Sequence, residues 1–280
     1  MKLLILGGNG MAGHMLVQYF KSQGRHTVFY TSRDPRDSNA LIVDASDCTM
    51  VEKVAEAVRP DVMINAIGIL NQFAEQDKIG AYHINGFLPH RLARTADQIG
   101  SRLIHISTDC VFSGNRGGYR EDDVPDGNSV YSLTKALGEV RSPRHVTVRT
   151  SIIGPEVRTG GIGLMEWFLH CQGTVSGYRK VMWNGVTTLE LAKAIDLLLT
   201  SPVSGLIHLA HPEAISKHDL LLLFQEIWEL QGITVVPSEE PVQDRTLVQS
   251  RSDWSYKVPH YREMLKELEQ WMREKSSVVA

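Results

Sequence analysis

The feature that most constrains the fold is a short apolar run that leads directly into closely spaced glycines. Residues 3–6 read as a β-strand, and Gly7, Gly10 and Gly13 follow in a GxxGxxG spacing. The first glycine permits a tight turn, the second lets the backbone approach a pyrophosphate, and the third allows close packing of helix on sheet. The helix N-terminus would offer free N–H groups to the phosphates. The dinucleotide contacts predicted in this turn are Gly7, Asn9, Gly10, Met11 and Gly13.

Strand-like and helical segments alternate through the first half of the chain. The strand candidates lie at residues 3–6, 27–30, 41–43, 62–65, 103–106 and 145–148. Uniformly apolar strands joined by helices are typical of a parallel sheet that is buried on both faces. A glycine motif alone would be weak evidence for a dinucleotide, but its place after the first strand of such a sheet makes it strong. We therefore expect an NAD(P)-binding Rossmann domain, a doubly wound parallel sheet, over residues 1–150.

The helical patterns continue into a less regular second half. The longest runs from about residue 76 to 99, where Gly100 is a suitable C-cap. Further helices are expected at residues 188–200, 217–231 and 262–275, with a short strand at 206–209 and a loop at 237–241. We expect residues 151–280 to form mainly a small α/β substrate-binding lobe, with some elements returning to the Rossmann domain.

Composition excludes several classes of protein. The 280 residues carry a formal net charge of −3, which gives the chain no overall attraction to nucleic acid. Three unspaced cysteines favour neither a disulfide framework nor a zinc site and fit a reducing compartment. The N-terminal apolar run is too short for a signal peptide or a membrane span. We expect a cytoplasmic protein with no nucleic-acid or membrane partner and no metal.

The end of the second strand bears on the choice of dinucleotide. An acid there would bind the ribose 2′-hydroxyl of NAD, whereas an arginine accommodates the 2′-phosphate of NADP. Ser32 and Arg33 occupy this place, and Asp34 would supply the acid if the strand ran further. We therefore expect NADP to be preferred, with NAD as the alternative.

Two other strand ends carry candidate cofactor contacts. Asp44 and Ala45 follow the third strand, and Ala66 and Gly68 follow the fourth. Ligands of open α/β sheets bind at the carboxyl ends of the strands. Asp44 would accept a hydrogen bond from the adenine amino group, or would instead cap the next helix. The small residues Ala66 and Gly68 would let the cofactor lie against the backbone.

A Tyr–Lys pair supplies the candidate proton-transfer chemistry. Thr108 ends the fifth strand, and Tyr131 and Lys135 are four residues apart, on one face of a helix. A phenol titrates near pH 10, and a neighbouring ammonium would lower its pKa. Tyr131 could then exchange a proton with a carbonyl oxygen that Thr108 polarises, while both helix residues also contact the cofactor. Such pairs are common by chance, but the glycine turn upstream makes a functional role the stronger interpretation.

The motifs resemble those of the extended short-chain dehydrogenase/reductases. More narrowly, residues 107–114 (STDCVFSG), 131–139 (YSLTKALGE) and 148–151 (VRTS) are similar to the dTDP-4-dehydrorhamnose reductase branch. The resemblance runs through residues 1–155 and more loosely beyond. Two positions depart from the branch: Cys110 stands where a tyrosine is typical, and Ile152 stands where a tryptophan is typical. That tryptophan is associated with the substrate pocket, so these departures leave the sugar open.

The resemblance implies a Rossmann domain with a small C-terminal lobe, the catalytic roles given above, and a nucleotide-activated sugar as substrate. We expect reduction of the 4-keto group of a 6-deoxysugar that is linked to dTDP or UDP, with an N-acetylated sugar as a competitor, in polysaccharide precursor synthesis. An epimerase or dehydratase of the same superfamily is the nearest alternative. A dehydratase would usually have Asp-Glu after Thr108, and here Asp109-Cys110 follows. A non-catalytic NADP-binding regulatory subunit is a third possibility, although such proteins tend to lose the Tyr or the Lys.

Substrate contacts are expected mainly from the second half. Arg158 would hold a pyrophosphate, Trp183 would stack on a base or cover a sugar face, and Asn184 would bind a hydroxyl or carbonyl. Asp109 and Val111, which follow the catalytic threonine, complete the expected substrate contacts. A homodimer is compatible with the sequence, which does not specify the oligomeric state.

Overall fold

The computed structural model describes residues 1–157, 161 and 163–279, and the side chains through residue 275. A seven-stranded parallel sheet in the order β11-β6-β5-β4-β1-β2-β3 forms its centre. Its strands are β1 (Lys2–Leu6), β2 (Thr27–Ser32), β3 (Leu41–Ile42), β4 (Val62–Asn65), β5 (Arg102–Thr108), β6 (Val146–Thr150) and β11 (Gly205–His208). The chain leaves β1 for β2 and β3 on one side and then returns to β4 on the other. This order confirms the expected doubly wound Rossmann sheet.

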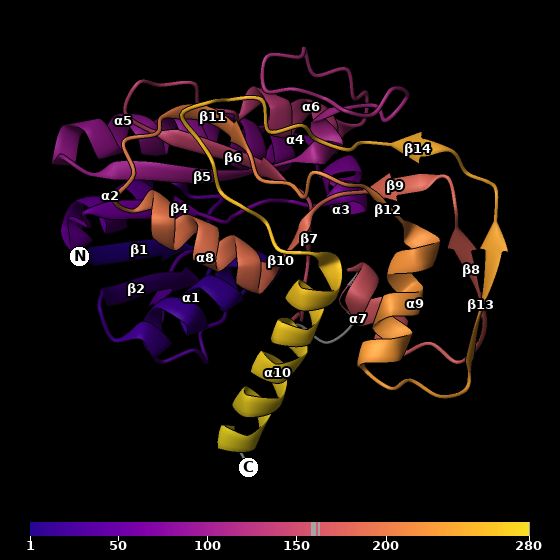
Figure 1. Ribbon diagram of the computed structural model, residues 1–280. Helices are drawn as coiled ribbons and strands as arrows, with labels where there is room; N and C mark the ends of the chain where they lie inside the picture. The colour runs from indigo at the N-terminus through magenta and orange to yellow at the C-terminus, as the bar shows by residue number, and fades with distance from the viewer. Residues whose placement is uncertain (158–160, 162, 280) are drawn as a thin grey trace.

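Helices cover both faces of the sheet (Figure 1), so its central strands are buried. Leu3 and Ile5 of β1 face a core that includes α1 (Met11–Gln23) and α8 (Thr188–Leu198). Leu4 and Leu6 face the opposite core, with α2 (Cys48–Val58) and α5 (Leu88–Ile99). The two-residue alternation along β1 therefore serves two separate hydrophobic layers.

The prediction of one continuous helix over residues 76–99 is wrong. The structure instead has α3 (Asn71–Gln76), α4 (Lys78–Ala81), the π-helix η1 (Tyr82–Phe87) and then α5. Pro89 has no N–H to donate to the Asn85 carbonyl four residues earlier, which favours a wider turn at this point. The Asn85 side chain accepts from Ile69 N at 2.8 Å and donates to Ile69 O at 2.9 Å. Asn85 also donates to Thr134 at 3.2 Å, so it joins the loop after β4 to the helix that carries Tyr131.

The C-terminal part of the chain forms a smaller α/β region beside the sheet (Figure 1). Its elements are β7 (Ile152–Ile153), α7 (Leu164–Leu169), β8 (Gly173–Tyr178), β9 (Val181–Trp183), β10 (Val186–Thr187), β12 (Ile215–Ser216), α9 (Lys217–Ile227), β13 (Ile233–Ser238), β14 (Gln243–Asp244) and α10 (Tyr261–Val279). β8 pairs with β13 in parallel, so the loop expected at residues 237–241 begins inside a strand. α8 and β11 belong to the Rossmann layers, although both follow residue 150.

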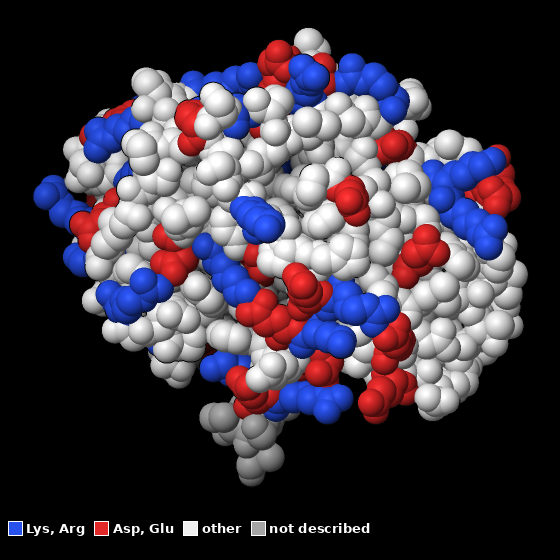
Figure 2. Space-filling view, in the orientation of Figure 1, with Lys and Arg blue, Asp and Glu red and all other residues white. Residues whose placement is uncertain are grey.

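Charged side chains of both signs are interspersed on the face shown in Figure 2, as expected for a net charge of −3. Within the described residues, no helix has the length and apolar character that a membrane crossing requires.

Candidate active site

A pocket lies over the glycine-rich turn, at the carboxyl ends of the parallel strands where the strand order reverses. Open α/β sheets bind ligands at this place. The predicted cofactor residues that line the pocket are Gly7, Asn9, Gly10, Met11, Ser32, Arg33, Asp44, Ala45, Ala66 and Gly68. Sequence reasoning missed other lining residues, including Thr31, Val43, Ile69 and Ile84. Their apolar or small side chains carry no pattern that would have marked them.

Backbone geometry explains the glycine spacing. Gly7 has a φ of 82°, in the left-handed region that glycine tolerates best. A Cβ on Gly13 would lie 2.0 Å from the Gly7 carbonyl oxygen, so a larger residue would push the helix away from the turn. Gly13 thus supports the pocket from behind rather than lining it. No side chain caps α1 at Gly10, which leaves the N-terminus of this helix open to an anion.

The edge of the pocket at β2 favours a phosphate over a hydroxyl. Strand β2 runs to Ser32, further than expected, but the Asp34 carboxylate binds the Arg36 side chain at 2.7 and 2.9 Å. Those bonds lower the pKa of Asp34 to about 2. Arg33 is exposed and lines the pocket, while Asp34 does not. The Asn9 amide donates to Ser32 Oγ at 2.8 Å and thereby ties the glycine turn to this edge.

Asp44 does not cap the following helix. Its Oδ1 accepts from Ser46 N at 2.9 Å in a local turn, and Asp47 instead caps α2 by accepting from Met50 N. The Ser46 hydrogen bond outweighs burial and lowers the pKa of Asp44, and the charge of Arg33 acts in the same direction. Asp44 therefore faces the pocket as a carboxylate.

Tyr131 and Lys135 both lie on α6 (Val130–Leu137), beside the end of β5. The Thr108 hydroxyl lies near enough to the Tyr131 phenol to lower its pKa. Lys135 Nζ donates to the carbonyl oxygen of Ile106 at 2.8 Å. Tyr131 also packs with Ile69, which lines the pocket, and with Cys110. The structure thus brings the three predicted catalytic residues together, next to the predicted cofactor site.

The expected lowering of the Tyr131 pKa is wrong for this structure. Burial raises the pKa of Tyr131 well above its ordinary value, and the Thr108 hydroxyl only partly opposes this. Burial also lowers the pKa of Lys135 to about 8, against the opposing charge of Glu139. The Lys135 ammonium donates to the Ile106 carbonyl. Tyr131 is a protonated phenol at neutral pH.

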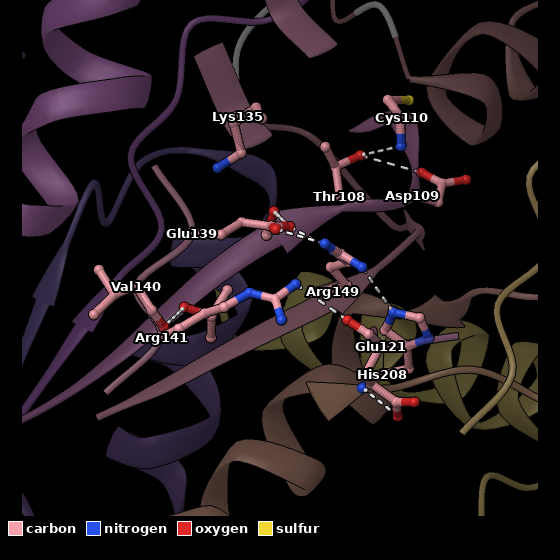
Figure 3. Close-up of polar contacts among 12 residues, drawn as sticks. Thr108, Asp109, Cys110, Glu121, Lys135, Glu139, Val140, Arg141, Arg149 and His208 are labelled. Atoms are coloured by element: carbon pink, nitrogen blue, oxygen red, sulfur yellow. Dashed lines mark hydrogen bonds and ion pairs between the residues drawn. The ribbon is translucent and has the colours of Figure 1, made fainter. Parts of the chain in front are cut away.

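A group of charged side chains, Asp109, Lys217 and Arg245, lies next to Thr108. The two basic residues were not predicted from the sequence. The Thr108 hydroxyl donates to Asp109 Oδ1 at 3.1 Å (Figure 3). Burial raises the pKa of Asp109, while the charges of Arg245 and Lys217 oppose this. Arg245 Nη1 lies 3.6 Å from Cys110 Sγ. Both basic residues lie more than a hundred positions from Thr108, so no local spacing in the sequence links them to it.

The side chains of Lys217 and Arg245 have only part of their hydrogen-bonding capacity filled by the described residues. The buried Nε of Arg245 has no hydrogen-bond partner among the described residues. Lys217 Nζ lies over the Trp183 ring at 5.2 Å, and burial lowers its pKa to about 8. Lys217 also lines a pocket with Trp167 and Tyr178 in the C-terminal region. These features suit an anionic ligand between the catalytic threonine and this region.

Three of the expected substrate contacts require correction. Trp183 is buried in the core and packs against Tyr261, so it offers no exposed ring face for a base. Asn184 donates to His211 O and Leu247 O and accepts from Leu247 N, so its amide is fully used by backbone. The Val111 side chain is buried in a small hydrophobic cluster. Residue type suggested binding at these positions, but the side chains pack inward. Arg158 lies outside the described residues.

A comparison with protein families decides the wider identity. The model of the RmlD substrate binding domain matches residues 1–251. The chain belongs to the RmlD substrate-binding family. This membership confirms the resemblance found in the motifs around Thr108, Tyr131 and Arg149.

Curated relatives of this RmlD-family chain have more than one role. The spore coat polysaccharide biosynthesis protein SpsK of Bacillus subtilis is 26% identical, covering 99% of this chain and 98% of that protein. A dTDP-4-dehydrorhamnose reductase of Mycobacterium tuberculosis is 30% identical, covering 69% and 68%. Methionine adenosyltransferase 2 subunit beta of Xenopus tropicalis is also 30% identical, covering 86% and 76%.

The fold of the RmlD-family chain also occurs in solved structures. The dTDP-4-dehydrorhamnose reductase of Bacillus anthracis in complex with NADP superimposes with a TM-score of 0.82, covering 98% of this chain and 99% of that one. Its sequence identity is 20%, so this likeness concerns the fold.

Proposed function

We propose that this protein is an NADPH-dependent reductase of the 4-keto group of a nucleotide-activated 6-deoxysugar, linked to dTDP or UDP. The observation that carries the proposal is that Tyr131, buried beside Thr108, shares α6 with Lys135 and packs against Ile69, a residue that lines the glycine-turn pocket. Sugar-nucleotide reductases among the relatives support the same class. The reaction requires a proton donor at the carbonyl oxygen and a polarising group beside it.

The glycine-turn pocket fits the cofactor. The open N-terminus of α1 and the side chain of Arg33 would hold phosphates, and the glycines leave room for them. Tyr131, Lys135 and small residues such as Ala66 would contact the rest of the cofactor. When bound, NADPH supplies the hydride that the carbonyl carbon receives.

Tyr131 would act as the proton donor. Its phenol is protonated at neutral pH, so the hydroxyl can donate to the carbonyl oxygen as negative charge develops there. Thr108 lies beside the phenol, and Asp109 accepts from the Thr108 hydroxyl.

Lys217 and Arg245 would hold the anionic part of the substrate. They are the two cations whose charges act on Asp109, and Arg245 has a buried Nε that is free to donate. Charge-assisted bonds from such groups to phosphate oxygens are strong. A nucleotide diphosphate therefore suits this side of the site better than a neutral sugar does.

The test is a panel of dTDP-, UDP-, GDP- and CDP-linked 4-keto-6-deoxysugars, with and without N-acetylation, followed by NADPH oxidation. A reductase consumes one NADPH for each sugar, whereas an epimerase or dehydratase regenerates its cofactor. If none of these substrates led to NADPH oxidation, the proposal would be overturned.

A second candidate is a non-catalytic NADP-binding subunit of another enzyme. The relative named methionine adenosyltransferase 2 subunit beta favours it. The assembled Thr108, Tyr131 and Lys135 favour the reductase instead, since a binding subunit needs no proton donor. A tight NADPH complex with no turnover on the panel would support this second candidate.

A further inference from the structure

A buried ion pair lies beyond the C-terminal end of α6. Arg149 Nε and Nη2 donate to the two carboxylate oxygens of Glu139, each at 2.6 Å. The side chains are 0% and 2% exposed. Figure 3 shows the Arg149 guanidinium between Glu139 and His208, whose Nε2 lies 3.3 Å from Arg149 Nη1. Bidentate pairs of this kind are directional, and loss of one partner leaves a costly unpaired charge.

Glu139 also joins α6 to the strand that carries Thr108. Ser107 Oγ donates to Glu139 Oε1 at 2.9 Å. Two consecutive residues near the β5 end therefore hold this segment: the Ile106 carbonyl binds Lys135, and Ser107 binds Glu139. Lys135 lies on α6, and Glu139 follows just beyond its C-terminal end. Any slip of this segment along β5 would break both bonds together.

The carboxylate also acts on the lysine through its charge. Burial disfavours the ammonium of Lys135, and the opposing influence comes from Glu139. Other ionisable groups face the lysine from two further elements. His105 of β5 is buried and has its pKa lowered by burial and by the charge of Lys135, so it is neutral. Arg149 of β6 lies on the far side of the carboxylate, and Tyr131 lies on the same helix.

We propose that Glu139 is a positioning residue, which fixes the end of α6 on β5 through Ser107 and on β6 through Arg149 and places its carboxylate near Lys135. Its kinetic consequence rests on the proposed reductase function. Its effect on the charge of Lys135 does not, because that charge exists without turnover.

The central experiment replaces Glu139 by glutamine, which keeps the side-chain shape and removes the charge. Lysines labelled with ¹³C at Cε are titrated by NMR, with Lys135→Met used to assign the signal. We expect Glu139→Gln to lower the Lys135 pKa by about one unit or more. In the same variant, the basic limb of the kcat–pH profile should move to lower pH by a similar amount.

Two matched variants separate charge from structure. Glu52 forms a comparable pair with Arg91, between α2 and α5, so Glu52→Gln should leave the Lys135 titration unchanged. Ser107→Ala keeps the charges of Glu139 and Lys135 but removes one of the two bonds that hold this segment to β5. It should lower kcat with little change in KM and should leave the Lys135 pKa in place. An unchanged kcat in Ser107→Ala would contradict the positioning role.

Glu139→Gln leaves Arg149 buried without its partner and could prevent folding. The double variant Glu139→Gln/Arg149→Met removes both charges and is expected to fold. It should lower the Lys135 pKa in the same direction. If Lys135 had the same pKa as in the wild type in a folded variant that lacks the Glu139 carboxylate, the inference would be overturned. If the wild type reduced no sugar nucleotide, the proposed function would fail, while the lysine titration would still decide this inference.

Discussion

The Lys135 ammonium donates a hydrogen bond to the carbonyl oxygen of Ile106 at 2.8 Å, so the lysine is held against the strand that ends in Thr108. This contact ties α6, which also carries Tyr131, to β5. The buried Tyr131 phenol is protonated at neutral pH.

Replacement of Tyr131 by phenylalanine should remove the proton donor and little else. We expect kcat to fall by about 10²- to 10⁴-fold, the range typical of a lost acid–base group. NADPH affinity should change much less, because the glycine turn and Arg33 are untouched. Steady-state kinetics and fluorescence titration with NADPH would measure both. Tyr82→Phe, at an exposed position of η1, is the matched control and should leave both kcat and NADPH affinity unchanged.

The buried Lys135 should make stability depend on pH. Its pKa of about 8 lies below the ordinary 10.5, so the unfolded chain binds more protons between these values. Stability from this group therefore rises as the pH increases from about 8 toward 10.5. The measured quantity is the difference in free energy of unfolding between Lys135→Met and the wild type. This difference, variant minus wild type, should decrease by on the order of 3 kcal/mol across this pH window. Urea unfolding at several pH values measures it, and a constant difference would contradict burial of the charge.

Arg33 should determine the cofactor preference. Asp34 is engaged by Arg36 and does not line the pocket, whereas Arg33 does. Arg33→Ala should weaken NADPH binding by about tenfold or more and leave NADH binding unchanged. Dissociation constants for the two cofactors in both proteins would show this. Equal losses for NADPH and NADH would mean that Arg33 does not contact a 2′-phosphate.

Lys217 and Arg245 should control substrate binding. Lys217→Met and Arg245→Met should each raise KM for the sugar nucleotide by about 10- to 100-fold, as expected for lost charge-assisted bonds. NADPH affinity should stay constant. Lys180→Met is a suitable control, since Lys180 is exposed and lies 3.5 Å from Glu239. If all three variants had the same KM, the anionic group would bind elsewhere.

The parts of this protein that follow from local sequence patterns were predictable. The glycine turn and the Tyr131–Lys135 spacing depend on neighbours along the chain, and β1 and β4 are largely apolar runs. The π-helix was not predictable, because it depends on Pro89 and on tertiary bonds of Asn85. Several short strands of the C-terminal region have only two or three residues, too few for a periodic signal.

Long-range contacts account for the rest of the differences. Lys217 and Arg245 approach Asp109 only after the C-terminal region folds beside the sheet. Trp183 and Asn184 have side chains suited to binding, yet their partners are Tyr261 and the backbone around Leu247. A sequence pattern shows which chemistry a side chain carries, but the direction in which it points is set by tertiary packing.

In the proposed reaction, a hydride and a proton are added across a sugar ketone, and isotope transfer detects this addition. NADPH deuterated at both C4 positions of the nicotinamide is incubated with the wild type and the best substrate of the panel. We expect one NADPH oxidised for each sugar consumed, and deuterium at C4 of the sugar product, with Tyr131→Phe nearly inactive. Product without deuterium, or NADPH bound with no turnover of any substrate, would contradict it.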